Sequence, residues 1–128
     1  MRLLLDTHAL LWFPMGDSRL SAPARQAIED GGNRKFVSIA GLWEIAIKVR
    51  LGKLELDVPL ERLPAFIEAS RMNVLAIGAP HALAEVHPAP ATRDPFDRLL
   101  LAQCQVERMQ LVTLDRALAS HPLAMRVS

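Results

Sequence analysis

The chain has 128 residues, about one domain's length, and 51% of them are hydrophobic, which is enough for a packed core and too many for a disordered chain. Basic and acidic residues number 15 and 14, so net charge indicates no nucleic-acid partner, and any such binding needs a local basic patch. Cys104 is the single cysteine, which excludes an internal disulfide, and the N-terminal apolar run is too short for a signal sequence or membrane span, so we expect one soluble cytoplasmic domain over residues 1–128.

The first half of the chain alternates short apolar segments with helical patterns. A strand is expected at residues 2–5, and Asp6 or Thr7 could cap the helix that follows at 8–13 and is ended by Pro14 and Gly16. Next come a helix at 22–29, a strand at 35–38, a helix at 39–51 and a small extended piece at 56–58.

The second half repeats this alternation. We expect a helix at 60–72, a strand at 74–77, a short helix at 80–86, a proline-rich loop, and a helix at 95–108. A strand at 111–113, a helix at 114–120 and an edge strand at 123–127 complete the chain. Short, uniformly apolar strands alternating with helices indicate an α/β domain with a mostly parallel sheet covered on both faces.

Acidic residues stand at four junctions between these elements. Asp6 follows the first strand, Glu44 lies in the second turn after the second strand, Asp97 lies in the first turn of the long helix, and Asp115 follows the fourth strand. Because the carboxyl ends of parallel strands share one edge, where ligands of such sheets bind, we expect these side chains to meet there.

A structural explanation exists for each acidic residue taken alone. Asp6 and Asp115 could be helix caps, Glu44 could form a solvated ion pair with Lys48, and Asp94 and Asp97 could stabilise a helix N-terminus. We keep the capping explanation for Asp94. The coincidence at four junctions favours a shared site, because capping does not require Glu44.

Clustered carboxylates stay ionised only when a cation compensates their charge. Oxygen ligands favour Mg²⁺ or Mn²⁺, which suit phosphodiester hydrolysis by polarising a phosphoryl oxygen and orienting a hydroxide, and one carboxylate could serve as general base.

Four segments resemble the motif blocks of the PIN domain, and more closely those of VapC-type ribonuclease toxins of bacterial toxin–antitoxin pairs. They are LLLDTHALLW at 3–12, LWEIAIK with GKL at 42–54, DPFDRLL at 94–100 and LVTLD at 111–115. The resemblance runs from residue 3 to about 118 in the family's order and spacing. One position departs from it: close relatives often have His where this chain has Thr92, which removes a possible contact to the site or to phosphate.

This resemblance implies a three-layer α/β/α sandwich and a Mg²⁺-dependent endoribonuclease in which Mn²⁺ can substitute. The metal-site carboxylates of the family match Asp6, Glu44, Asp97 and Asp115, and Thr113 matches a polar residue that holds a water or a carboxylate. It also implies a homodimer inhibited by a cognate VapB-type antitoxin, whose C-terminal segment covers the active site and whose own domain binds operator DNA.

Basic residues are expected near the acidic edge, where they could contact RNA phosphates, although each alone is better explained as a solvated charge: Lys48, Lys53, Arg93, Arg98 and Arg116. Trp12 and Trp43 are predicted to be core residues and His8 a partly buried structural residue. Two alternative functions are a non-catalytic interaction module on the same fold and, ranked lower, an aspartate-dependent phosphatase, since His8 stands where that chemistry commonly uses a second Asp.

Overall fold

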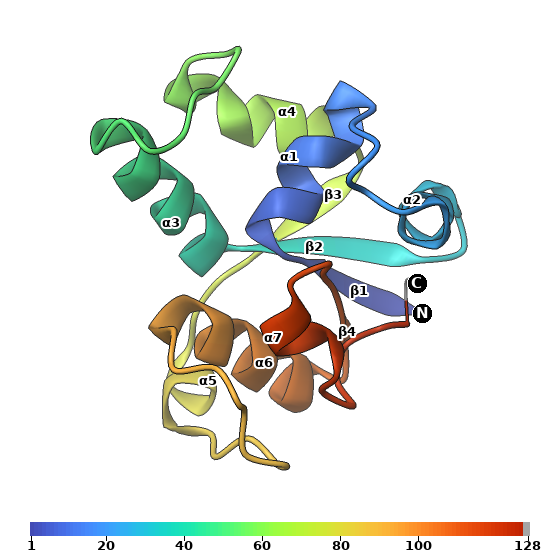
Figure 1. Cartoon of the computed structure of the whole chain (residues 1–128), viewed down its shortest axis with the longest axis vertical. Coiled ribbons are helices and arrows are strands. Elements are labelled where there is room, and N and C mark those ends of the chain that lie inside the picture. Colours follow the sequence, from blue (N-terminus) through green and yellow to red (C-terminus); the bar gives the residue numbers. More distant parts are fainter. Residues whose placement is uncertain (127–128) are drawn as a thin grey trace.

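Four parallel strands form one sheet at the centre of the molecule (Figure 1). The computed structural model describes residues 1–126. Within them the strand order is β3-β2-β1-β4, and the strands are β1 (Arg2–Leu5), β2 (Arg34–Ser38), β3 (Met72–Leu75) and β4 (Gln110–Val112). Every neighbouring pair is parallel, so the predicted α/β fold with a parallel sheet is confirmed.

Helices cover both faces of this sheet (Figure 1). One face packs against α1 (Thr7–Met15), α2 (Ala22–Glu29), α3 (Ile39–Arg50) and, after the 3-10 turn η1 (Leu60–Arg62), α4 (Leu63–Ala69). The other side carries α5 (Ala79–Leu83), α6 (Pro95–Glu107) and α7 (Arg116–Ala119). None of the helices in residues 1–126 has the length and apolar character needed to cross a bilayer.

Alternation along β1 divides the core into two clusters. Leu3 and Leu5 point to one face, where they pack with Leu10, and Leu4 points to the other, where it packs with Leu101. All of these leucines are at most 2% exposed, and full burial of one such side chain contributes about 1.5–3 kcal/mol. Burial on both faces explains why β1 is a continuous apolar run.

Strand register brings the carboxyl ends of β1 and β4 side by side. Leu5 lies opposite Val112 on one side and opposite Val37 of β2 on the other. The Asp6 backbone N–H then donates to the Val112 carbonyl at 3.1 Å. The residues that follow β1, β2 and β4 therefore share one edge of the sheet.

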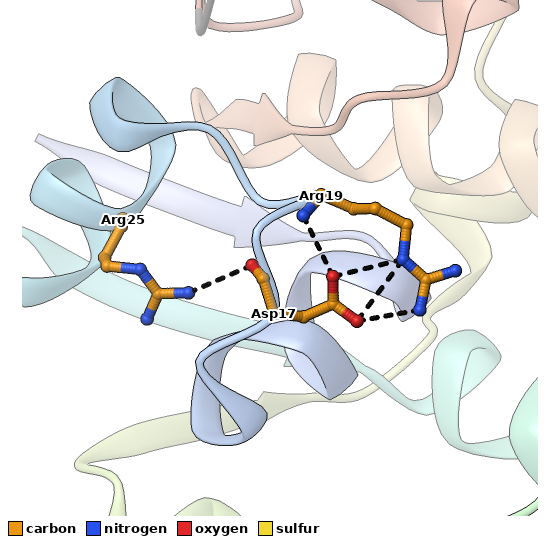
Figure 2. Close-up of polar contacts among 3 residues, drawn as sticks. All are labelled: Asp17, Arg19 and Arg25. Carbon is orange, nitrogen blue, oxygen red and sulfur yellow. Dashed lines mark hydrogen bonds and ion pairs between the residues drawn. The ribbon is translucent and has the colours of Figure 1, made fainter.

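The connection between α1 and α2 is held by charged groups (Figure 2). Gly16, in the left-handed conformation at φ 63°, ends α1, and Arg19 then donates to both carboxylate oxygens of Asp17, the closer contact being 2.7 Å. These hydrogen bonds lower the pKa of Asp17 to about 2. Arg25 of α2 donates to the Asp17 carbonyl at 3.4 Å and to the Phe13 carbonyl at 3.1 Å, which fixes the end of α1.

Several predicted boundaries are wrong. Pro14 lies inside α1 near its C-terminus instead of ending it. The third strand begins at Met72 and ends at Leu75, two residues earlier than predicted. Met72 is buried whereas Val74 is 45% exposed, because β3 lies at the edge of the sheet; apolar character alone therefore misplaced the strand.

Two predicted extended segments are also wrong. Residues 56–58 form no strand and lie in the loop before η1. The predicted strand at 123–127 is reduced to an isolated bridge between Ala124 and Leu111, and its last residue, Val127, lies outside the described residues.

Candidate functional site

Asp6 lies directly after β1 and is 7% exposed. Its Oδ1 accepts from the Ala9 N–H at 2.9 Å, which caps α1, and its Oδ2 accepts from the Thr113 hydroxyl. Burial raises the pKa of Asp6, and the nearby charge of Asp115 raises it further. Asp6 is therefore both the helix cap that the sequence allowed and a member of a charged group at the sheet edge.

Glu44 projects from the second turn of α3 into the protein and is 9% exposed. Its Oε1 accepts from the Thr7 hydroxyl at 2.5 Å, and its Oε2 lies 3.1 Å from Lys48 Nζ. The predicted Glu44–Lys48 pair exists, but the expectation of a solvated carboxylate is wrong. Since α1 and α3 pack together, Thr7 at the start of α1 reaches Glu44 directly.

Asp97 is the third residue of α6 and is half-buried. The Thr92 hydroxyl donates to its Oδ2 at 3.3 Å. Burial raises the pKa of Asp97 to about 6, helped by the charges of Asp94, Asp115 and Glu44. Asp94 is the N-cap as predicted, accepting from the Phe96 N–H at 2.8 Å.

Asp115 is exposed and caps α7, accepting from the Ala117 N–H at 2.8 Å. Its charge raises the pKa of both Asp6 and Asp97, and Glu44 also acts on Asp97. The structure thus brings the four residues into one electrostatic group, hereafter the acidic cluster: Asp6, Glu44, Asp97 and Asp115.

The donors of the acidic cluster fit a hard divalent cation. They are all carboxylate oxygens, and their mutual repulsion favours binding of a positive charge. Within residues 1–126, no three His, Cys, Asp or Glu side chains are gathered closely enough to form a complete ligand group. Mg²⁺ does not need one, because it commonly retains several waters and binds through one or two carboxylates plus substrate phosphates.

Basic residues surround the acidic cluster in different ways. Lys48 pairs with Glu44, and Arg98 donates from Nε to the Thr92 carbonyl at 2.9 Å. Arg93 and Arg116 are exposed next to the caps of α6 and α7. These side chains carry positive charge beside the acidic edge, where a phosphate backbone could be contacted.

Aromatic residues near the site differ from expectation. Trp43 is 62% exposed, so its predicted core position is wrong, and it packs edge-to-face on Phe96 with centroids 5.6 Å apart. His8 is exposed and lies against Trp12, which is partly buried against the core as predicted. Trp43 precedes Glu44 and Phe96 precedes Asp97, so this aromatic pair borders the acidic cluster.

Thr7 and Thr92 are contacts to the acidic cluster that the sequence did not reveal. The resemblance implies the loss of a possible site contact at Thr92, yet the Thr92 hydroxyl donates to Asp97. A signal was present in the sequence: Thr-x-Asp occurs at 92–94 and again at 113–115.

Residues 3–122 match the family model of the PIN domain. The chain therefore belongs to the PIN domain family, a family of nucleases whose members typically use divalent metals. No curated protein matches the chain significantly.

Proposed function

We propose that this PIN domain, spanning residues 1–128, is a Mg²⁺-dependent endoribonuclease that hydrolyses RNA phosphodiester bonds, with Mn²⁺ able to substitute. The observation that carries the proposal is the placement of four carboxylates at one sheet edge of a PIN domain, where burial and neighbouring carboxylates raise the pKa of Asp97 to about 6. A structure that holds like charges together at one sheet edge favours a compensating cation.

The acidic cluster of Asp6, Glu44, Asp97 and Asp115 would hold this cation, one or two carboxylates binding it directly and the others acting through its retained waters. When bound, the cation polarises a phosphoryl oxygen and offsets charge that develops on it. The chain itself contributes orientation: Thr113 fixes one oxygen of Asp6, and Thr7 fixes one oxygen of Glu44. The second oxygens of these two carboxylates also have partners, the Ala9 N–H at Asp6 and the Lys48 ammonium at Glu44.

RNA would approach along the exposed edge beside the acidic cluster. Lys48, Arg93, Arg98 and Arg116 supply positive charge there, which suits contacts to phosphates without reading bases. The overall charge of the chain is only +1, so this local arrangement, and not net charge, would attract the substrate.

We also propose a biological role for this nuclease, as the toxin of a VapC-type toxin–antitoxin pair. It is supported by the four motif blocks in the order and spacing of those toxins, including DPFDRLL at 94–100. A cognate VapB-type antitoxin would inhibit the enzyme and supply contacts to operator DNA.

A homodimer belongs to the same proposal and has support in α3. Ile39, Trp43 and Leu51 are 41%, 62% and 63% exposed, and with Ile47 they recur every four residues along one side of the helix. An apolar stripe of this kind is typical of a protein interface. Its spacing is symmetric about residue 45, so two antiparallel copies could pair Ile39 with Leu51 and Trp43 with Ile47.

Cleavage of a structured RNA in Mg²⁺ tests the proposed activity. Wild type should cleave, Asp97→Asn should lose cleavage, and Asp94→Asn should nearly retain it, because asparagine still caps α6. All three proteins should keep the fold by circular dichroism, and EDTA should stop the wild type. Equal cleavage by wild type and Asp97→Asn would refute the assignment. A wild type that cleaves no RNA, with or without Mg²⁺, would favour a non-catalytic interaction module.

A further inference from the structure

All three threonines of the chain contact the acidic cluster. Thr7, Thr92 and Thr113 are 6%, 8% and 0% exposed. Their hydroxyls donate to Glu44, Asp97 and Asp6, respectively. Buried hydroxyl groups need partners, and here each hydroxyl proton is donated to a carboxylate of the acidic cluster.

Thr92 and Thr113 use the same local arrangement. Each Oγ1 accepts, at 3.1 Å, the backbone N–H of an aspartate two residues later, Asp94 or Asp115, and that aspartate caps the next helix. A backbone N–H can only donate, so the hydroxyl must act as acceptor in this bond. Its own single proton is then left for the carboxylate of Asp97 or Asp6.

The arrangement at Thr92 also removes a competing conformation of Asp97. Asp97 is the third residue of α6, and an acidic side chain at that position commonly reaches back to the N–H of the capping residue. The capping residue is Asp94, and Thr92 Oγ1 already occupies its N–H. Asp97 therefore cannot fold back onto the helix end without displacing the threonine.

We propose that Thr92 is a positioning residue that holds the Asp97 carboxylate toward the acidic cluster, by the arrangement in which Thr113 holds Asp6. This role rests on the proposed metal-dependent function. It assigns a purpose to Thr92: its hydroxyl orients Asp97 while its oxygen accepts from the N–H of the residue that caps α6.

Mn²⁺ affinity, measured by calorimetry, tests this role in wild type, Thr92→Val and Thr92→Ser. Valine keeps the shape of threonine but removes the hydroxyl, and loss of a group that orients a metal ligand typically weakens metal binding about 10-fold or more. Serine restores the hydroxyl and should bind within about twofold of wild type. Ser21→Ala is the matched control, since it removes a capping hydroxyl from α2, which carries no member of the acidic cluster.

A second readout needs no metal. In a crystal structure of Thr92→Val in EDTA, the Asp97 carboxylate should accept from the freed Asp94 N–H. If valine impairs folding, Thr92→Ala provides the same test with a smaller side chain.

The outcomes separate this role from the proposed function. A wild type that binds no Mn²⁺ overturns the metal site and, with it, the role of Thr92. A wild type that binds Mn²⁺, with a folded Thr92→Val that binds equally well and leaves Asp97 in place, overturns only the positioning role.

Discussion

Replacement of Asp97 by asparagine should stabilise the metal-free protein while it abolishes cleavage. The carboxylate lies half-buried beside Asp94, Asp115 and Glu44, and its pKa is raised from 3.8 to about 6. The folded state therefore prefers protonated Asp97, and the stability associated with that proton is present below about pH 4 and lost as pH rises through about 6. Asparagine resembles the protonated acid and should not suffer this loss.

The expected gain in unfolding free energy follows from the raised pKa of Asp97. About two pKa units correspond to roughly 3 kcal/mol at neutral pH, and we take half, about 1.5 kcal/mol, because a half-buried group is screened by solvent. The asparagine also forgoes the carboxylate's attraction to the helix dipole, about 0.5 kcal/mol. The net gain in unfolding free energy is about 1 kcal/mol, or a melting temperature higher by about 3–5 °C for a chain of this size.

Thermal unfolding followed by circular dichroism in EDTA measures the effect. The difference between Asp97→Asn and wild type should be small near pH 4 and grow to its full value at about pH 7. A variant that is less stable than wild type at neutral pH, or a difference that does not change with pH, would refute the reasoning about carboxylate repulsion.

Other properties of the fold predict further results. Mn²⁺ should raise the melting temperature of wild type, with reversal by EDTA and little effect on Asp97→Asn, because a ligand that binds only the folded state stabilises it. Cys104, whose pKa burial raises to about 12, should resist thiol reagents in the native protein and react readily in urea; equal rates would contradict its burial. Trp43→Glu should convert a dimer to a monomer in light scattering without loss of fold, whereas an unchanged mass would exclude the α3 stripe as the interface.

The position of the acidic residues was predictable because topology decides it. Alternating strands and helices imply parallel strands, and parallel strands place Asp6 and Asp115 at one edge regardless of side-chain detail. The start of α6 was equally clear, since Asp94 and Pro95 form a strong helix N-terminus. These features depend on chain direction and capping, which short sequence patterns contain.

The orientation of α3 was not predictable from its pattern. Trp43 and Glu44 are adjacent, and hydrophobicity predicts that the tryptophan is buried and the glutamate exposed, yet Trp43 is 62% exposed and Glu44 is 9% exposed. The inversion occurs because Thr7, from a distant part of the chain, offers Glu44 a hydrogen bond. Such a partner depends on the packing of α1 against α3, which no local segment encodes.

The contact between Thr113 and Asp6 joins residues 107 positions apart. During synthesis on the ribosome, β1 is made before the other strands, and β4 is made after β1, β2 and β3. The nascent polypeptide therefore carries an incomplete acidic edge until the residues that follow β4 have been made. A polypeptide that stops before Thr113 therefore lacks the hydroxyl that binds Asp6, and its acidic edge is incomplete.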